Sequence, residues 1–291
     1  MNATATTPAA IAERVARKRR GLAWARTFEG RIGLAILIAV ALLVTIGPLL
    51  APYPPDEIGV GVPLATPEGG HLLGTDQLGR DLFSRYLDGG TTIVLVPLAA
   101  NLLGFFVGGM LGLLGAYYGG RADSFIARVF DLVIAIPSLL LTLVLIAGLG
   151  TSWSTLIFVI AIVTAPRAGR VVRGAAQSVA VNDYVVAARL RGESVWWVLC
   201  REILPNASGP IAAIFSLYLT YAIITVSTLS FLGLGAQPPS SDWGLLVAEG
   251  RDVLTINPWA TLVPAFSIGL LAIAFTLIAD SIDRRTAEGE A

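Results

Sequence analysis

Residues 32–51 read IGLAILIAVALLVTIGPLLA, a stretch that contains no Asp, Glu, Lys or Arg. About 20 helical residues, at ~1.5 Å per residue, cross the ~30 Å hydrocarbon core of a bilayer. A single segment satisfies all of its own backbone hydrogen bonds there only as a helix. Four more runs without charged residues follow along the chain, at residues 89–120, 132–166, 203–241 and 253–279. This pattern predicts an all-α membrane protein.

The composition agrees with this prediction. Hydrophobic residues make up 55% of the 291 residues and charged residues 14%, whereas a soluble domain carries roughly 25% charged residues. Too little polar surface remains to coat a soluble globule of this size. The formal net charge is zero, which gives no reason to expect a nucleic-acid partner. Cys200 is the single cysteine, so no intrachain disulfide is possible.

Glycine- and proline-rich interruptions divide the charge-free runs into helices of plausible length. The run at 132–166 is too long for one helix and contains the sequence GLGTS at 148–152, which predicts a hairpin. We therefore expect about six transmembrane helices, at residues 32–51, 91–118, 124–149, 153–172, 207–234 and 258–280. The first run is longer than a signal-peptide core of about 7 to 15 residues, which favours an uncleaved signal anchor.

The distribution of Lys and Arg predicts the orientation, because cytoplasmic loops hold the excess of these residues. With both termini in the cytoplasm, the inside segments hold 17 of the 20 basic residues and the outside segments hold nine acidic residues. The expected organisation is a cytoplasmic tail at 1–31, a first transmembrane helix at 32–51, an extracytoplasmic segment at 52–90, a five-helix core at 91–280 and a cytoplasmic tail at 281–291.

Gly104, Gly108 and Gly112 recur at intervals of four in the helix expected at 91–118. Small residues at this spacing let another helix approach closely. The stripe fits ordinary helix packing within the chain, and it also fits a subunit interface or a moving contact.

The chain lacks the side chains of several catalytic centres. Lys18 is the only lysine and lies in the basic N-terminal tail, so the chain has no Gly-x-x-x-x-Gly-Lys phosphate cradle. His71 is the only histidine, which excludes a His-based metal site of two or more ligands. Asp131 is the acidic residue placed deepest in an expected span. We expect a protein that is not an enzyme, binds no metal and takes its energy from a partner.

An expected inside segment at 167–202 is far longer than a turn between helices requires, and it carries nine charged residues. Its middle, NDYVVAARLRG, predicts a short amphipathic helix. Asp183 lies near the N-terminus of this helix, where the helix dipole favours an anion, and Gly192 is suited to end it. The small side chains of Ala187 and Ala188 allow another surface to approach closely.

This segment resembles the cytoplasmic motif of ABC importer permeases, which has Glu-Ala-Ala, three residues and Gly, followed by Ile-x-Leu-Pro or a close variant. In that family the short helix docks into a cleft on the ATPase subunit. The resemblance assigns ATPase coupling to Asp183, Tyr184, Ala187, Ala188, Gly192, Ile203, Leu204 and Pro205. The chain departs from the motif at Val186, where the family has an acidic residue. A helix lying on the membrane surface is the alternative for this segment.

Further blocks strengthen the resemblance, which covers roughly residues 74–285. In their order along the chain they resemble the second permease subunit of dipeptide, oligopeptide and nickel importers. The signature positions are Gly74, Thr75, Asp76, Gly79, Arg80, Asp81, Pro137, Arg170, Arg173, Gly233 and Gly235.

The resemblance implies a multi-pass subunit of the bacterial inner membrane that works in a complex. The expected partners are a homologous second permease subunit in a heterodimer, two ATPase subunits and an extracytoplasmic substrate-binding protein. ATP and Mg2+ are used by the ATPase subunits, and no cofactor is bound by this chain. The outer loops at 52–90 and 235–257 would meet the binding protein.

Peptide is the first expectation for the solute and nickel the second. The competing classes are a secondary transporter or channel that works alone, and an intramembrane enzyme. The sequence identifies no residue of the substrate path.

Overall fold

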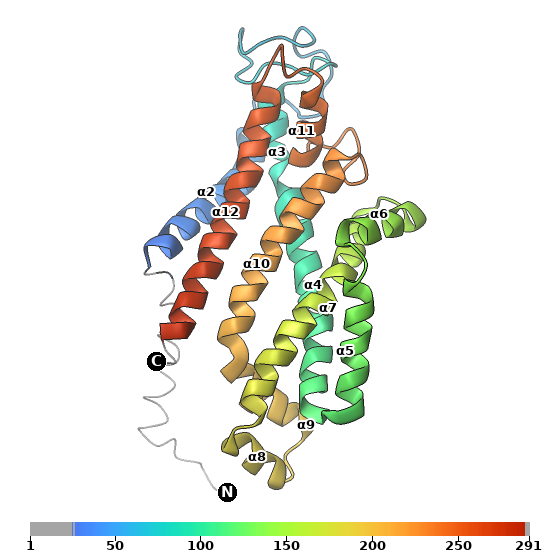
Figure 1. Cartoon of the computed structure of the whole chain (residues 1–291). Coiled ribbons are helices and arrows are strands. Elements are labelled where there is room, and N and C mark those ends of the chain that lie inside the picture. The colour runs from blue at the N-terminus through green and yellow to red at the C-terminus, as the bar shows by residue number, and fades with distance from the viewer. Residues whose placement is uncertain (1–24, 26, 289–291) are drawn as a thin grey trace, which may run out of the picture.

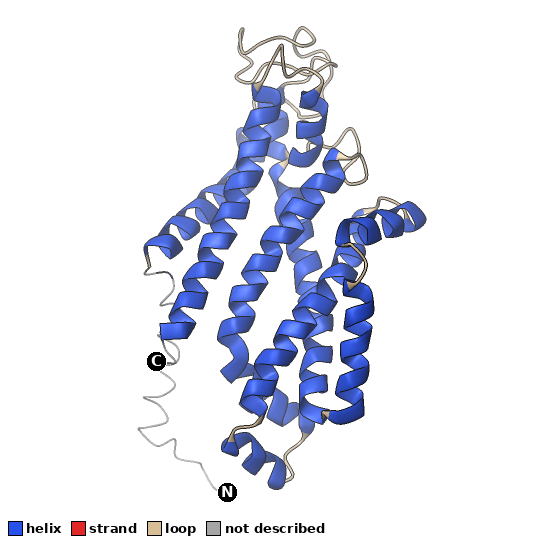
Figure 2. Cartoon of the chain, viewed as in Figure 1, coloured by secondary structure: helices blue, strands red, loops and turns tan. Residues whose placement is uncertain are grey.

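Helices form the regular structure of the chain, of which a computed structural model describes residue 25 and residues 27–288. Figure 2 shows helices joined by loops throughout this part of the chain. The helices are α2 (Phe28–Leu50), α3 (Leu82–Asp88), α4 (Gly90–Tyr118), α5 (Gly120–Ile134), α6 (Ser138–Leu149), α7 (Trp153–Ala180), α8 (Asp183–Leu190), α9 (Val195–Trp197), α10 (Leu204–Phe231), α11 (Trp243–Arg251) and α12 (Trp259–Glu288).

Five helical stretches are long and apolar enough to cross a membrane, and the bent pair α5 and α6 makes a sixth if it counts as one span. The prediction of about six spans is therefore confirmed. α2 and α4 begin and end within a few residues of the helices expected at 32–51 and 91–118. α3 continues directly into α4, so this span begins earlier than predicted, at Leu82.

The third span is not the single helix expected at 124–149. It bends by 83° between α5 and α6. Pro137 lies at the break: it has no backbone N–H and disfavours the helical conformation of Ile136 before it. α6 consequently projects away from the other helices (Figure 1).

α7 is longer than the span expected at 153–172 and continues to Ala180. Its second half carries Arg167, Arg170 and Arg173 at helical spacing. These charges do not end the helix.

α4 and α7 pack very closely along the glycine stripe. A Cβ on Gly108 would lie 1.9 Å from the carbonyl oxygen of Ala165, and one on Gly112 would lie 2.3 Å from that of Gly169. A Cβ on Gly104 would also lie 3.1 Å from a carbonyl oxygen of α7. The stripe therefore packs two helices of the same chain, as the ordinary interpretation predicts.

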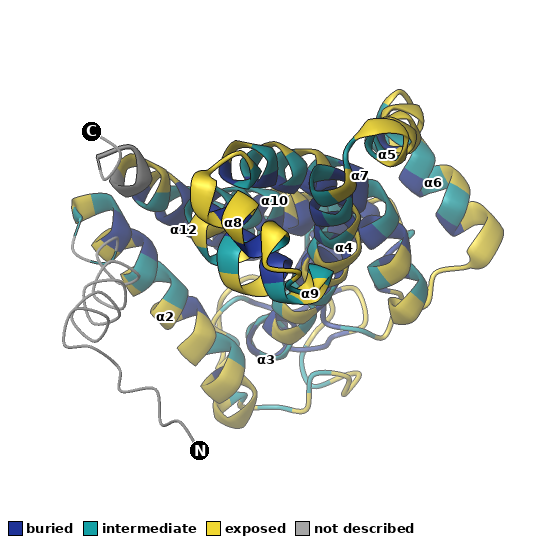
Figure 3. Cartoon of the chain, turned by 90° about the horizontal axis from the view of Figure 1, so that it is seen from below, coloured by how far each residue is buried: buried dark blue, intermediate teal, exposed yellow. Residues whose placement is uncertain are grey.

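α12 lies beside α10 on one side and beside α2 on the other. α2 stands at the edge of the molecule, with most of its surface exposed (Figure 3). The apolar core has two main parts: one lies among α4, α7, α10 and α12, and the other joins the end of α4 to the segment between α7 and α10.

Candidate functional site

The segment between α7 and α10 forms one end of the molecule. α8 lies at the lower end of the view in Figure 1, and the loops at 52–81 and α11 lie at the upper end. The two regions that the sequence singled out, the charged inside segment and the outer loops, are thus at opposite ends of the helices.

The ends of α8 are defined by the residues that the sequence predicted. Asn182 is the N-cap residue, and Asp183 occupies the first turn. At the other end Gly192 adopts φ +77°, its N–H donates to the carbonyl of Arg189 at 3.0 Å, and the next N–H donates to that of Ala188 at 3.3 Å. These two bonds form a Schellman motif, in which glycine avoids the steric cost of a left-handed conformation.

One face of α8 packs against its own chain. Val185 and Ala188 are fully buried in an apolar cluster that includes Val198 and Ile203. Of the two adjacent alanines that the sequence offered for close approach by a partner, Ala188 points inward and only Ala187 is exposed. A helix of eight residues has two sides, and the sequence alone did not separate them.

The opposite face of α8 is open, as the view along the helices from this end shows (Figure 3). Tyr184 and Val186 are each 43% exposed and Leu190 is 84% exposed. Asp183 and Ala187 are exposed beside them. This outer face of α8, made of Asp183, Tyr184, Val186, Ala187 and Leu190, is mainly apolar, and Val186 lies within it.

The chain enters α10 through a π-helical segment, Val198–Ile203, that follows α9. Pro205 lies in the first turn of α10 and cannot donate a backbone hydrogen bond to the turn before it. Such a gap in the helical hydrogen bonding favours a local π-helical turn. Ile203 is fully buried, whereas Leu204 is 37% exposed, so Ile203 anchors the segment and Leu204 reaches its surface.

Arg189 connects α8 to the end of α4. Its guanidinium lies 4.3 Å from the ring centroid of Tyr117, in the geometry of a cation–π contact. Its Nε and Nη2 atoms are buried and have no hydrogen-bond partner within the described part of the chain. The motif includes Arg189, and Tyr117 lies two residues before Gly119, but neither feature of the sequence predicts this contact.

Two arginines of α7 pair with aspartates of α5. Arg173 binds Asp123 with two of its nitrogens, and Gln177 donates to the same carboxylate at 3.3 Å. Arg170 pairs with Asp131, and both side chains are more than half exposed. The signature positions Arg170 and Arg173 therefore hold α5 beside α7.

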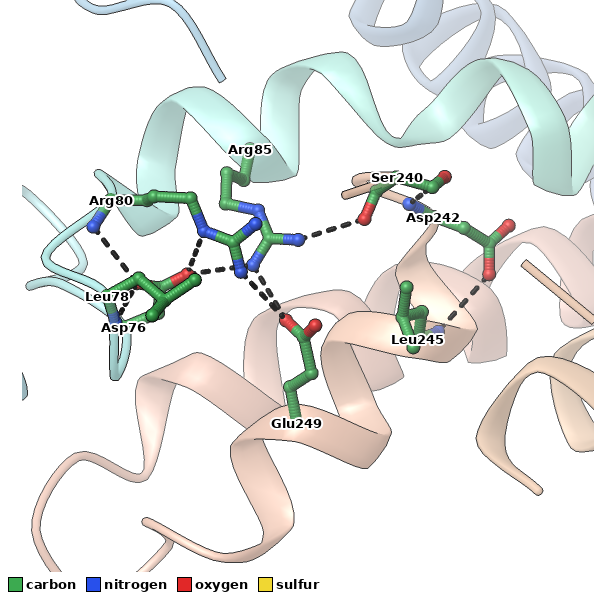
Figure 4. Close-up of polar contacts among 8 residues, drawn as sticks. All are labelled: Asp76, Leu78, Arg80, Arg85, Ser240, Asp242, Leu245 and Glu249. Carbon is green, nitrogen blue, oxygen red and sulfur yellow. Dashed lines mark hydrogen bonds and ion pairs between the residues drawn. The ribbon is translucent and has the colours of Figure 1, made fainter. Parts of the chain in front are cut away.

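The block at 74–81 folds into a tight loop at the end of the molecule opposite α8 (Figure 1), and Figure 4 shows the polar contacts around Asp76. Asp76 lies at its centre: Oδ1 accepts the backbone N–H groups of Leu78 and Arg80 at 2.8 and 2.9 Å. Its Oδ2 accepts Arg80 Nε at 2.6 Å and Arg85 Nη1 at 3.0 Å. One carboxylate thus closes the loop and fastens it to α3.

Arg85 joins this loop to α11. Its side chain is fully buried, and Nη1 donates to Glu249 Oε2 at 2.7 Å while Nη2 donates to the carbonyl of Ser240 at 2.9 Å. The sequence does not indicate Arg85 and Glu249 as partners, because they are 164 residues apart. A signal was present, because Arg85 is one of only three basic residues in the expected outside segments.

Asp81 caps α3 and binds the only histidine. Its Oδ2 accepts the backbone N–H of Ser84 at 2.8 Å, and its Oδ1 lies 2.8 Å from His71 Nδ1. The signature residue Asp81 therefore has a structural role at this end of the molecule.

The glycines of the same block are required by its geometry. Gly74 and Gly79 adopt φ +77° and +71°. A Cβ on Gly74 would lie 2.2 Å from the carbonyl oxygen of Ala65, and one on Gly79 would lie 2.5 Å from that of Gly61. Thr75, between them, accepts the N–H of Ala65 at 2.9 Å.

A cavity of about 580 Å³ opens beside this network, between the loop at 56–82 and the region of α11. Its lining combines acidic groups, one arginine and apolar side chains. The lining residues are Asp56, Ile58, Asp76, Gln77, Leu78, Arg80, Leu82, Pro238, Pro239, Leu246, Glu249, Gly250, Asp252, Val253 and Ala260.

Asp242 caps α11 from a fully buried position. Its Oδ1 accepts the N–H groups of Gly244 and Leu245 at 3.0 and 3.2 Å. Burial raises the pKa of this carboxyl above its usual value, and the two amide bonds only partly oppose that rise.

The remaining signature positions lie at turns. Pro137 precedes α6 at the bend of the third span. Gly233 adopts φ +75° just after α10, and a Cβ on Gly235 would lie 2.3 Å from Ser230 Oγ. None of these three positions lies near α8. The positions that the motif assigned to coupling thus lie together around α8, whereas the signature positions are spread over both ends and the middle of the molecule.

The fold, a bundle of apolar helices with an exposed short helix between α7 and α10, is that of a transporter's membrane component. The chain belongs to the family of binding-protein-dependent transport system inner membrane components, whose model matches residues 100–288. It is a multi-pass inner-membrane permease and a non-catalytic subunit.

Particular relatives are transport permeases of bacteria. The chain is 39% identical to the Escherichia coli (strain K12) protein named "Probable D,D-dipeptide transport system permease protein DdpC", over 85% of this chain and 83% of that one. It is 35% identical to the dipeptide transport system permease protein DppC of Haemophilus influenzae, over 86% and 87%. It is also 35% identical to the glutathione transport system permease protein GsiD of Pectobacterium atrosepticum, over 89% and 87%.

A solved structure supports the fold. A chain of the inward-facing MetNI methionine ABC transporter matches with a TM-score of 0.52 at 15% identity, over 67% of this chain and 94% of that one. The prediction of an ABC importer permease fold is confirmed.

Proposed function

We propose that this permease forms half of the translocation pathway of an ATP-driven importer of short peptides. The observation that carries the proposal is the similarity, at 35–39% identity over most of the chain, to permeases named for dipeptide, D,D-dipeptide and glutathione transport. These solutes share a short peptide backbone with a free carboxylate.

The proposed complex contains a homologous second permease, two ATPase subunits that use ATP and Mg2+, and an extracytoplasmic substrate-binding protein. The end with α8 faces the cytoplasm and the end with the loop at 74–81 faces outward, as the distribution of basic residues predicts. The outer face of α8 docks on the ATPase. Since Val186 replaces the acidic residue of the motif, this contact is apolar and steric at that position.

Coupling follows from how α8 is held. Val185 and Ala188 bury its inner side against the segment leading into α10, and Arg189 stacks on Tyr117 at the end of α4. Closure of the ATPase subunits would therefore move α8 together with the ends of α4, α7 and α10. The paired permeases would switch between inward- and outward-facing states by such rigid-body motion.

Uptake into proteoliposomes tests the transport function. Liposomes containing this chain, the second permease and the ATPase subunits should take up a radiolabelled dipeptide when ATP and the loaded binding protein are present. A complex with an ATPase subunit unable to hydrolyse ATP is the control and should take up none. Uptake by this chain alone, driven by a proton or sodium gradient, would show a secondary transporter instead. ATP-driven uptake of nickel without uptake of peptide would refute the proposed solute.

Docking of α8 is tested by adding a bulky charge to its outer face. Ala187→Arg should leave the amount of complex in the membrane unchanged but reduce uptake per ATP hydrolysed. Ser178→Arg is the matched control, because Ser178 is an exposed residue of α7 outside that face. Ala188 is unsuitable for this test, because a large residue there would disrupt the buried side of α8. Normal coupling in Ala187→Arg places the docking surface elsewhere.

A further inference from the structure

Polar side chains gather on one exposed side of the helix bundle, within stretches that cross the membrane. Arg167 and Arg170 belong to α7, Asp131 to α5, and Tyr218 and Tyr221 to α10. Charged groups in spans rarely face lipid and usually face a water-filled cavity or another polar surface.

The contacts of these side chains place them in one group. Arg170 pairs with Asp131, with 52% and 62% of the two side chains exposed. α10 packs beside α7, which places Tyr218 within electrostatic range of Arg167 and Arg170. The ring centroids of Tyr218 and Tyr221 are 6.0 Å apart, and Tyr221 is 55% exposed. These polar side chains thus lie on neighbouring helices, α5, α7 and α10, and we refer to them as the polar face.

The depth of this face argues against contact with lipid. Arg167 lies 14 residues after Trp153, the first residue of α7, or about 21 Å along the helix. Since α7 has 28 residues, or about 42 Å, and the hydrocarbon core is ~30 Å thick, Arg167 lies at the middle of a helix long enough to cross that core. Tyr221 lies a further turn outward from the level of Tyr218, so the polar face extends away from the cytoplasmic boundary.

Arg167 differs from the other arginines of α7 in its partners. Arg170 and Arg173 each pair with an aspartate of α5. Within residues 27–284, no carboxylate pairs with Arg167, whose Nη1 has only a long contact of 3.4 Å with the Val163 carbonyl. This positive charge is thus left to attract an anion from outside the chain.

We propose that this face lines the aqueous translocation pathway and that Arg167, beside the Arg170–Asp131 pair, attracts the carboxylate of the passing solute. The inference rests on the permease function proposed above and names residues that line its translocation pathway. Tyr218 and Tyr221 provide the wall on the outer side of the charge.

Accessibility of an introduced thiol tests whether the face is wet. In the complete transporter in inverted membrane vesicles, Cys200→Ser removes the only thiol of this chain, and Tyr221→Cys adds one to the face; labelling is read on this chain after it has been purified from the other subunits. Leu95→Cys is the control, because Leu95 is also exposed, at 56%. Asn101 Nδ2 of α4 donates to the Phe215 carbonyl of α10. Leu95 and Tyr221 each lie six residues outward from that bond on these antiparallel helices, so the two positions are at about the same depth. A membrane-impermeant methanethiosulfonate should label position 221 and leave position 95 unlabelled.

The charge of the reagent tests the role of Arg167. The rate of labelling at position 221 is measured with an anionic sulfonatoethyl reagent and with a cationic trimethylammonium-ethyl reagent. Each rate is divided by the rate of the same reagent with a free thiol in solution. A unit charge about 10 Å away in water changes the local concentration of each reagent roughly twofold, in opposite senses. Arg167→Gln should therefore lower the anion-to-cation ratio at position 221 about fourfold at low salt, and Arg167→Lys should retain it. Changes in thiol reactivity cancel in this ratio.

Each outcome decides one part of the inference. Labelling at position 221 no faster than at position 95 would show that the face is covered by lipid or by the second permease, and would overturn the pathway. Rapid labelling with a ratio unaffected by Arg167→Gln would overturn the role of Arg167. Immunoblots of the vesicles check that each variant reaches the membrane. Neither reagent is a solute, so these results stand apart from a failure of peptide uptake.

Discussion

Replacement of Gly192 by leucine should uncouple ATP hydrolysis from uptake, because this residue sets the end of α8. Gly192 has φ +77°, and nothing lies within 4 Å of the position of a Cβ. A side chain there meets no neighbour, so the expected effect comes from the backbone conformation alone. A non-glycine residue in the left-handed region costs about 1–2 kcal/mol.

The magnitude follows from that strain. A cost of ~1–2 kcal/mol lowers the population of the native α8 turn, relative to its open form, about 5- to 30-fold. If docking requires the native turn, uptake per ATP hydrolysed in proteoliposomes should fall by up to the same factor. Gly192→Asn should lose less, since asparagine tolerates the left-handed region better than leucine.

Gly174→Leu is the matched control for added volume. Gly174 is an exposed residue of α7 with ordinary helical backbone and open space around its Cβ position. This variant adds the same side chain near the same end of the molecule without backbone strain, so its coupling should be normal. Equal losses in Gly174→Leu and Gly192→Leu, or normal coupling in both, would refute the reasoning.

Three further predictions concern the stability of the detergent-solubilised protein, measured by thermal unfolding. Gly108→Ala should destabilise it by about 1–3 kcal/mol or more, because the new Cβ meets the Ala165 carbonyl, whereas Gly109→Ala, with its nearest neighbour 3.6 Å away, should be close to neutral. Arg85→Met removes a fully buried cation from Asp76 and the half-buried Glu249, for which Arg80 remains the cationic partner in the described part of the chain; it should cost about 1–3 kcal/mol, against about 0–1 kcal/mol for Arg251→Met in an exposed pair. Since burial raises the pKa of Asp242, the folded state holds its proton to a higher pH than the unfolded state, so stability should decrease as pH rises from about 4 through that raised pKa and then level off. Asp242→Asn should flatten this part of the pH profile, and an unchanged profile would contradict the assignment.

The spans were predictable because a charged group in hydrocarbon is costly and leaves a clear mark on the sequence. Runs without charge therefore located α2 and α4 to within a few residues. The bend at Pro137 was not predictable in the same way. Pro97, Pro166 and Pro210 also lie in apolar runs, yet each lies inside a continuous helix. Whether a proline bends a span depends on which neighbouring helices support it, and the sequence does not contain that information locally.

The coupling segment was predictable as a motif but not as a surface. Its helix, its acidic first turn and its terminal glycine follow from local chemistry. The inward direction of Ala188 depends on the π-helical segment beyond it, and the stacking of Arg189 depends on Tyr117, 72 residues earlier. The network around Asp76 likewise joins α3 to α11. Contacts over such separations depend on the packing of whole helices.

The close glycine contact between α4 and α7 also leaves no single pivot between the two helices. On α7 it runs from Ala161 to Gly169, eight residues or about 12 Å, which is more than two helical turns. Two helices whose backbones touch over that length cannot rock against each other without separating at one end of the stripe. A stroke imposed at α8 should therefore move α4 and α7 as one unit and reach the α6 end through both helices.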